Sequence, residues 1–143
     1  MTYSTDVAAA RDLAIGIHAG QTDKAGQPYI GHLDRVAKRL SDPRAQVVAY
    51  LHDSIEDTGI DAAFLTEKFG DGTAYSVLKM THSPRTPYMD YVRAIKDDPI
   101  ARQVKISDLI DNSNLSRLPL VTIRDAERQR KYNDALQLLL SQQ

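Results

Sequence analysis

The stretch YLHDSIEDTGI, residues 50–60, carries a cluster of ionisable side chains just before Gly59, a residue type that favours the end of a helix. The cluster consists of His52, Asp53, Glu56 and Asp57. Residues four apart share one face of a helix, so we expect the His-Asp pair to lie under the Glu-Asp pair. Carboxylates at a helix C-terminus oppose the helix dipole and repel one another, so this cluster requires a compensating cation. Without a cation it is an ordinary polar helix end.

The residues before the cluster predict the helix that carries it. Asp42 and Pro43 form a helix start signal, because aspartate caps free N–H groups and proline fits the first helical position. The residues from there to Leu51 become apolar almost all round, as in a helix buried in the middle of a bundle. The predicted helix therefore runs from Asp42 into the His-Asp motif. Its ionisable end begins where the helix is still partly buried, and a buried charge must be paired or bound to a metal.

Helical periodicity extends over nearly the whole chain. The other segments that show it are residues 6–20, 29–41, 61–70, 71–82, 86–98, 99–114 and 123–140. We expect the first of these helices to be capped by Thr5 or Asp6, and Pro99 to separate two later ones. No segment alternates as a β-strand does, and there is no internal repeat. These patterns predict an all-α bundle of about seven to eight helices.

The composition excludes several classes of function. The net charge of −1 and the pI of about 6.4 leave no basic stripe for nucleic acid, although a local basic pocket for a small anion remains compatible with them. With no cysteine there is neither a disulfide framework nor a thiolate metal site. The N-terminus MTYSTDVAAARDL lacks a signal-peptide pattern, and no apolar run approaches the roughly 20 residues that cross a bilayer. We expect a cytoplasmic protein without a membrane or nucleic-acid partner.

Two further residues are candidate metal ligands. His32 follows the PYI segment at a helix start that looks buried, and Asp108 interrupts the apolar pattern of VKISDLI. Imidazole and carboxylate groups suit a divalent ion, and the two ligands of the HD pair alone would make a poor site. Taken singly, His32 also fits a core histidine and Asp108 an interior turn or cap acid. His18 and His82 are interpreted as helix-end residues without a functional partner.

The order His32, His52-Asp53, Asp108 resembles the H…HD…D signature of the HD-domain metal-dependent phosphohydrolases. The surrounding blocks HAGQTDKAGQPYIGHLDRVAKRL, AYLHDSIEDTGI, FGDGTAYSVLKMTHS and ARQVKISDLIDNSNL resemble the hydrolase domain of the RelA/SpoT type and the stand-alone small alarmone hydrolases. The resemblance runs from about residue 6 to residue 140. It implies that residues 1–143 form a single HD-type hydrolase domain with the HD-domain bundle fold.

The resemblance also implies a reaction. One metal ion, typically manganese (Mn²⁺) in this family, would be bound by His32, His52, Asp53 and Asp108. The pair Glu56-Asp57 would correspond to the catalytic acids of the family, which orient or deprotonate the attacking water or protonate the leaving group. The implied reaction removes pyrophosphate from the ribose 3′ position of guanosine tetra- or pentaphosphate (ppGpp or pppGpp). The expected partner is therefore a small-molecule nucleotide.

The same resemblance suggests substrate-binding residues. They are Lys24, Arg85, Lys105, Asn112, Arg128 and Tyr132, with Arg117 as a weaker candidate. An exposed loop lysine would explain Lys24 without a ligand, and an ordinary amphipathic helix surface would explain the pair on the last helix. Lys105 has a second explanation, because it lies three residues before Asp108 and can pair with that carboxylate.

Two residues depart from the family pattern. Asp23 stands where the family usually has an arginine before Lys24, and Leu109 stands where many members have a basic residue. An arginine can stack on a base, whereas an aspartate adds negative charge near a polyanion. The alternatives are therefore an HD phosphohydrolase for an adenosine alarmone or another 3′-phosphonucleotide, and a nucleotide-binding module without turnover.

Overall fold

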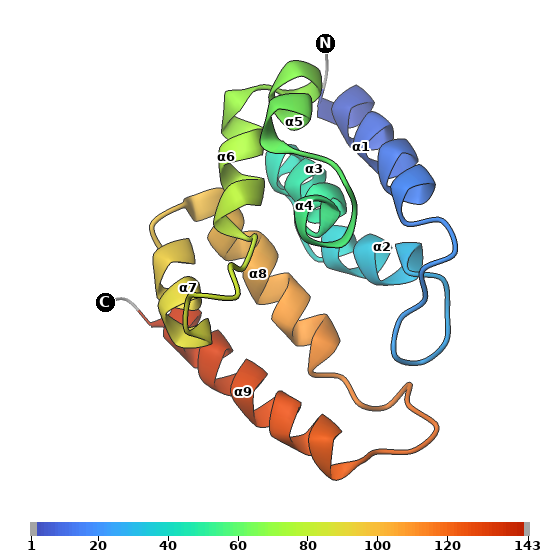
Figure 1. Ribbon diagram of the computed structural model, residues 1–143, viewed down its shortest axis with the longest axis vertical. Helices are drawn as coiled ribbons and strands as arrows, with labels where there is room; N and C mark the ends of the chain where they lie inside the picture. Colours follow the sequence, from blue (N-terminus) through green and yellow to red (C-terminus); the bar gives the residue numbers. More distant parts are fainter. Residues whose placement is uncertain (1–2, 142–143) are drawn as a thin grey trace.

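Helices make up the regular structure of the part of the chain that the computed structural model describes, which is the backbone of residues 3–141 and the side chains of residues 6–141 (Figure 1). These residues form α1 (Tyr3–Ile17), α2 (Ile30–Lys38), α3 (Pro43–Leu51), α4 (Ser54–Asp57), α5 (Ala62–Phe69), α6 (Asp71–Lys79), α7 (Tyr88–Ile95), α8 (Pro99–Asn112) and α9 (Ile123–Leu140). One isolated bridge joins Thr22 and Pro28. The predicted all-α fold is confirmed; the described helices number nine because one predicted helix is divided.

Helix α3 is the centre of the bundle and packs against α1, α2, α6 and α8. It starts as predicted, since Asp42 accepts a hydrogen bond of 2.9 Å from the Arg44 N–H and Pro43 occupies the first turn. Nearly every residue of α3 after its first turn is buried, because neighbouring helices cover it on all sides. The residues that follow α3 are therefore delivered to the middle of the molecule.

The prediction of one continuous helix from Asp42 to Asp57 is wrong. Helix α3 ends at Leu51, Asp53 has φ −97° and ψ 1°, and α4 is a separate turn of four residues. Side chains take carbonyls near the break: the Ser54 hydroxyl donates to Leu51 O at 2.6 Å, and His52 Nδ1 donates to Ala49 O at 2.7 Å. Side chains that bond to the backbone in this way compete with the helix ladder and bend it.

The predicted start of the first helix is also wrong. Helix α1 is already helical at Tyr3, so neither Thr5 nor Asp6 is its cap. Asp6 lies in the first turn instead, where a carboxylate is favoured by the positive end of the helix dipole. The later boundaries agree with the sequence: Asp98 caps α8 ahead of Pro99, and α9 spans the predicted residues.

Two loops complete the side of the bundle on which the ionisable residues gather. One joins α1 to α2 (residues 18–29), and the other joins α8 to α9 (residues 113–122). Figure 1 shows these loops next to each other, with α9 running along the outer side of α8. Among the described residues, no helix is both long and apolar enough to cross a membrane.

Candidate active site

The predicted ligands come from different helices and meet in the middle of the bundle. His32 lies in the first turn of α2, the His52-Asp53 pair lies between α3 and α4, and Asp108 lies within α8. Asp108 Oδ1 is 3.0 Å from His32 Nε2 and 3.2 Å from His52 Nε2. Donor atoms of His32, His52 and Asp53 lie within 4.8 Å of one another, a spacing that can hold a metal ion. Asp108 is outside this group of three but joins both imidazoles.

The orientation of the two imidazoles suits metal binding. His32 Nδ1 donates to Asp111 Oδ2 at 2.7 Å, and His52 Nδ1 donates to Ala49 O at 2.7 Å. Each Nδ1 therefore keeps its proton, and each Nε2 is directed at the carboxylates in the centre. A partner on the far nitrogen is the usual way in which proteins fix a ligand histidine. The residues present thus fit a divalent ion with oxygen and nitrogen ligands.

Charge is concentrated at this centre, where His32 is 3% and His52 is 2% exposed. Burial alone lowers the pKa of His52, but the nearby charges of Asp53 and Asp108 outweigh it and raise the pKa to about 9. Burial likewise lowers the pKa of His32, yet hydrogen bonds to Asp108 and Asp111 raise it overall. The carboxylates around the two imidazoles therefore favour positive charge at this centre, as a bound cation would supply.

Two predicted substrate contacts touch Asp108. Lys105 Nζ lies 3.0 Å from Asp108 Oδ2, and Asn112 Nδ2 donates to Asp108 Oδ1 at 3.2 Å. Burial raises the pKa of Asp108, whereas the charges of Lys105 and His52 lower it, and the net result is a pKa well below the usual range. Lys105 thus pairs with a candidate ligand, the second of its two explanations. It also lines a cavity of about 200 Å³ with Glu56, Lys131 and the rings around them.

Glu56 and Asp57 follow the His-Asp pair on the separate turn α4, and each carboxylate is held by a residue from another segment of the chain. The Glu56 carboxylate accepts a hydrogen bond from the His82 backbone N–H, and Asp57 Oδ2 accepts one of 3.2 Å from Gln21. Burial raises the pKa of Glu56; the His82 N–H opposes this shift and Asp53 adds to it. Glu56 borders the cavity with Lys105, whereas Asp57 borders the larger cleft described next.

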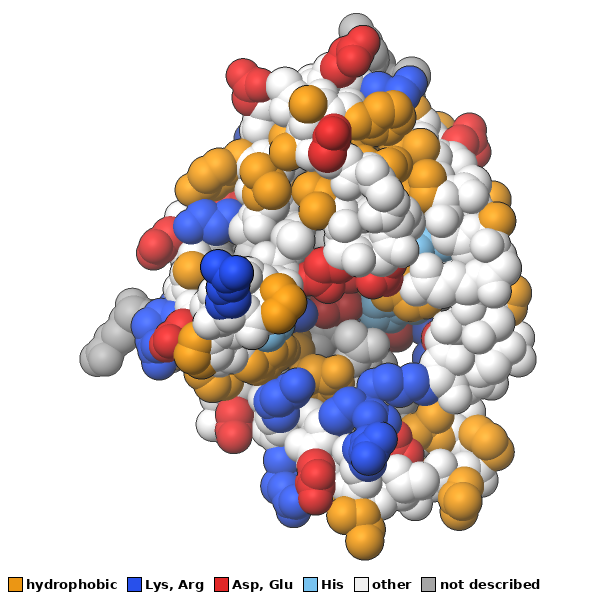
Figure 2. Space-filling view, viewed as in Figure 1, with side chains coloured by type: hydrophobic (Ala, Val, Ile, Leu, Met, Phe, Trp, Pro, Cys, Tyr) orange, Lys and Arg blue, Asp and Glu red, His pale blue; other side chains and the backbone are white. Residues whose placement is uncertain are grey.

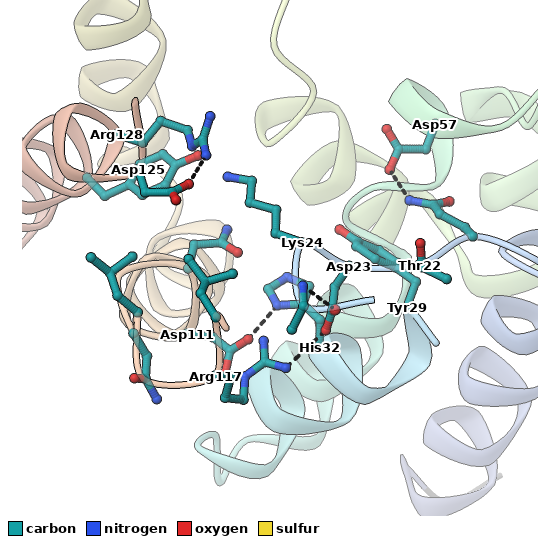
Figure 3. Close-up of a pocket in the computed structure, with 17 residues that line it drawn as sticks. Thr22, Asp23, Lys24, Tyr29, His32, Asp57, Asp111, Arg117, Asp125 and Arg128 are labelled. Atoms are coloured by element: carbon teal, nitrogen blue, oxygen red, sulfur yellow. Dashed lines mark hydrogen bonds and ion pairs between the residues drawn. The ribbon is translucent and has the colours of Figure 1, made fainter. Parts of the chain in front are cut away.

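A cleft of about 320 Å³ opens from His32 toward α9. Figure 2 shows its character: acidic and histidine side chains lie in a hollow, and Lys and Arg side chains gather along the neighbouring rim. In Figure 3, Lys24 extends from the 18–29 loop toward Arg128, which pairs with Asp125. The predicted contacts that line the cleft are Lys24, Asn112, Arg117, Arg128 and Tyr132. One end of the cleft is therefore lined by acidic and histidine side chains, and the other end is lined by basic side chains.

Three expectations do not match the arrangement. Arg85 is exposed on the loop between α6 and α7 and lines neither cavity beside the histidines. His18 is buried and bonds Gln21 at 2.7 Å, so it supports the residue that holds Asp57. His82 holds Glu56 through its backbone, and its ring packs on Tyr91 with centroids 4.6 Å apart. Neither histidine is therefore a helix end without partners.

Sequence reasoning missed three residues that support the centre. Tyr29 donates to Asp53, Asp111 accepts from His32, and Arg35 Nε donates to Asp111 Oδ1 at 2.8 Å. A signal for them was present, since Tyr29 and Arg35 flank His32 at a spacing of three, and Asp111 follows Asp108 at the same spacing. Side chains three apart on a helix are neighbours.

The fold and this cluster of side chains are those of an HD-domain protein. Comparison with known proteins indicates which type of HD-domain protein it is. The chain is 30% identical over 122 residues to a guanosine-3′,5′-bis(diphosphate) 3′-pyrophosphohydrolase of Aquifex aeolicus, covering 77% of this chain and 18% of that protein. It is 32% identical over 113 residues to a probable GTP pyrophosphokinase of Mycobacterium leprae, covering 70% of this chain and 14% of that protein. The chain thus spans less than a fifth of the length of these curated relatives.

A solved structure supports the fold. It is described as a metazoan ortholog of SpoT that hydrolyzes ppGpp, and it matches with a TM-score of 0.77 and 19% identity over 95% of this chain and 86% of that one. No family model matches the chain. The curated relatives show that this chain belongs to the HD-domain proteins of the RelA/SpoT hydrolase type, and the solved structure agrees with them in fold.

Proposed function

We propose that this protein is a metal-dependent nucleotide pyrophosphohydrolase that removes pyrophosphate from the 3′ position of guanosine tetra- or pentaphosphate. The observation that carries the proposal is the pairing of a buried histidine-carboxylate centre with a cleft of about 320 Å³ that has a basic end. The Aquifex aeolicus relative bears the name of this activity. The pyrophosphokinase names of other relatives refer to much longer proteins, of which the match covers 14% in Mycobacterium leprae.

The proposed ligands of one divalent ion are His32, His52, Asp53 and Asp108, and Mn²⁺ is the ion we propose. Such an ion supplies Lewis acidity, which polarises a phosphoryl oxygen and makes water more acidic. The support lies in the donor set, two imidazole nitrogens with carboxylate oxygens, and in the Nδ1 contacts that direct each Nε2 inward. Tyr29 orients Asp53 by donating to it, and Asn112 does the same for Asp108.

Glu56 and Asp57 are the proposed catalytic acids. In the hydrolysis, water adds to phosphorus, the bond between phosphorus and the ribose 3′ oxygen breaks, and that oxygen gains a proton as pyrophosphate leaves. Glu56 suits the transfer of the proton because burial raises its pKa toward neutrality and the His82 N–H fixes its carboxylate. Asp57 lines the cleft of about 320 Å³ and is oriented by Gln21. We therefore assign it to positioning the water or the leaving oxygen.

Substrate binding is assigned to the basic end of the cleft. Lys24 and Arg128 provide charge for the 5′ diphosphate, and the Tyr132 ring offers a face on which a base can stack. Asn112 lies on the rim between the two ends, and Lys105 neutralises charge beside Asp108. Arg85 keeps its place in the proposal only as a contact for phosphates that extend beyond the cavities.

Asp23 bears on which base the cleft accepts. Asp23 lines the cleft at the position where an arginine is expected, so a cationic plane for stacking is missing there. An adenosine alarmone or a plain 3′-phosphonucleotide is therefore the alternative substrate. The proposal further includes one HD-type domain over residues 1–143, a cytoplasmic location and a small-molecule partner; the continuous core that extends over α1 to α9 supports the single domain.

The test is pyrophosphate release by the purified protein with Mn²⁺ and then with EDTA. The substrates are guanosine tetraphosphate, its adenosine counterpart and a plain 3′-phosphonucleotide, and Asp53→Asn is the matched inactive control. Metal-dependent release from the guanosine compound is the expected result. Preference for another compound would keep the reaction and change the substrate. No release from any compound, with nucleotide still bound, would replace the enzyme with a binding module.

A further inference from the structure

The basic end of the cleft lies between two loops that come from distant parts of the chain. The 18–29 loop carries Lys24, and the 113–122 loop carries Arg117. Arg117 Nη1 donates to Asp23 Oδ2 at 3.1 Å and so joins residues 94 positions apart. Figure 3 shows this contact at the rim, beside the His32 to Asp111 hydrogen bond. One ion pair therefore connects the two edges of the cleft.

Asp23 also organises its own loop. Its Oδ1 accepts hydrogen bonds from the backbone N–H groups of Ala25 and Gln27, at 2.9 and 3.0 Å. Its Oδ2 faces Arg117 and, at 3.7 Å, Arg35. The side chain is 8% exposed, although aspartate is usually a surface residue. Burial raises the pKa of Asp23, but the Gln27 N–H and Arg117 lower it overall. The carboxylate therefore stays ionised, and each of its two oxygens has a hydrogen-bond partner.

Lys24 lies on this loop among charged groups of both signs. Burial and the positive charge of Arg128 lower the pKa of Lys24, and Lys131 adds to this shift, whereas Asp125 and Asp108 oppose it. The ammonium lies over the Tyr132 ring, 5.8 Å from its centroid. Asp23 immediately precedes Lys24 and fixes the backbone that carries it through the Ala25 and Gln27 N–H groups.

We propose that Asp23 and Arg117 form a latch across the rim of the cleft, which holds Lys24 beside Arg128 in advance of nucleotide binding. Asp23 is thus a positioning residue and makes no contact with the base. The latch concentrates positive charge without a ligand, so a polyanion binds without first ordering the loops. As far as the nucleotide is concerned, this inference rests on the proposed function.

Four variants test whether the Asp23–Arg117 ion pair, and not only the hydrogen bonds within the 18–29 loop, holds the rim. Asp23→Asn retains an oxygen for the Ala25 and Gln27 N–H groups but loses the charge that attracts Arg117. Arg117→Gln removes the other charge, and the double variant removes both. Arg117→Lys restores the charge in a different shape. The control is Arg124→Gln, which removes one positive charge from an exposed residue of α9 that lines neither cavity beside the histidines.

Two measurements are made on each variant: hydrogen exchange in residues 21–28 and 113–121, and steady-state hydrolysis of the substrate that the wild-type protein prefers. We expect each single charge removal to speed exchange in both loops and to raise KM about three- to tenfold, with kcat within about twofold. The double variant is expected to be no worse than the worse single variant, because both changes break one contact. Arg117→Lys should recover part of the KM, and Arg124→Gln should match the wild type.

The latch is overturned if Asp23→Asn and Arg117→Gln leave both loops protected, or if their effects on exchange add. It is also overturned if kcat falls and KM does not, because that pattern would assign Asp23 to the reaction. Hydrogen exchange needs no turnover. A wild-type protein that hydrolyses none of the nucleotides would therefore refute the proposed function, and coupled loop protection would still decide whether the latch exists.

Discussion

The histidine-carboxylate centre, here called the histidine end, and the basic end of the cleft that opens from His32 are built in opposite ways. The histidine end is assembled from α2, the break between α3 and α4, and α8, and its imidazoles are nearly inaccessible. The basic end comes from the 18–29 and 113–122 loops and from α9, and its Arg117 side chain is 34% exposed. Buried charges are costly unless every one is paired, whereas exposed pairs are screened and contribute little. The proposed reaction centre is therefore held by the core, and the proposed substrate contacts lie in more exposed segments, where changes are better tolerated.

The largest expected effect is at the histidine end. Asp53→Ala should abolish Mn²⁺ binding and hydrolysis together, a loss of about 10³-fold or more in kcat, because it removes a carboxylate from a group whose donor atoms lie within 4.8 Å. Calorimetric titration with Mn²⁺ and pyrophosphate release measure the two properties. Asp134→Ala, an exposed acid on α9, is the control. Full metal affinity in Asp53→Ala would remove this residue from the ligand set.

Glu56→Gln tests whether different residues at the histidine end bind the metal and transfer the proton. The amide keeps an oxygen to accept from the His82 N–H but cannot transfer a proton. We expect Mn²⁺ binding to remain and kcat to fall about 10²- to 10⁴-fold. If the variant stays fully active in the pyrophosphate assay, the role assigned to the Glu-Asp pair is wrong.

Asp111→Asn should weaken the histidine end without touching the substrate. The carboxylate accepts from His32 Nδ1 and from Arg35, so the change removes one of the two counter-charges of each group and leaves the imidazole only Asp108 and the guanidinium only the more distant Asp23. We expect the free energy of unfolding to fall by about 3 kcal/mol and Mn²⁺ affinity to fall about 10- to 100-fold. Urea unfolding and metal titration measure these changes. Unchanged affinity would mean that Asp111 only stabilises the fold.

At the basic end, Arg128→Gln should change binding more than turnover. We expect KM to rise about tenfold, kcat to change little, and the dependence of KM on salt to weaken, because the lost contact is electrostatic. Initial rates at several concentrations of sodium chloride provide the test, with Arg130→Gln, an exposed residue of the same helix, as the control. A large fall in kcat at constant KM would contradict the assignment of Arg128 to substrate binding and of the reaction to the histidine end.

The smallest expected effect concerns pH at the rim. The folded-state pKa of Asp23 is lowered overall, so its contribution to stability is present above the unfolded pKa, about 4, and is lost as pH falls through the folded value. Wild type should exceed Asp23→Asn by about 1 kcal/mol or less at neutral pH, and the difference should close below about pH 4. Thermal unfolding of both proteins across this range measures it. A difference that widens in acid would reverse the assigned sign.

Local signals in the sequence predicted most helix boundaries, because caps, prolines and apolar periodicity act over a few residues. The Asp42-Pro43 start and the whole of α9 are examples. The break after Leu51 was missed, since the bonds from His52 and Ser54 to nearby carbonyls depend on how the buried side chains pack. Arg85 was misplaced relative to the cavities for a related reason: a loop without periodicity gives no direction for its side chains.

The sequence by itself determined the residue types, their order and the helices that carry them, and its resemblance to the HD-domain phosphohydrolases implied that His32, His52, Asp53 and Asp108 form one set. Tertiary structure alone decided how far apart their donor atoms lie and which groups hold them. Tyr29, Asp111 and Arg35 act across helices, and Asp23 meets Arg117 across 94 residues. Such contacts form only when distant parts of the chain fold together, and the spacing of residues along the sequence does not show which parts will meet.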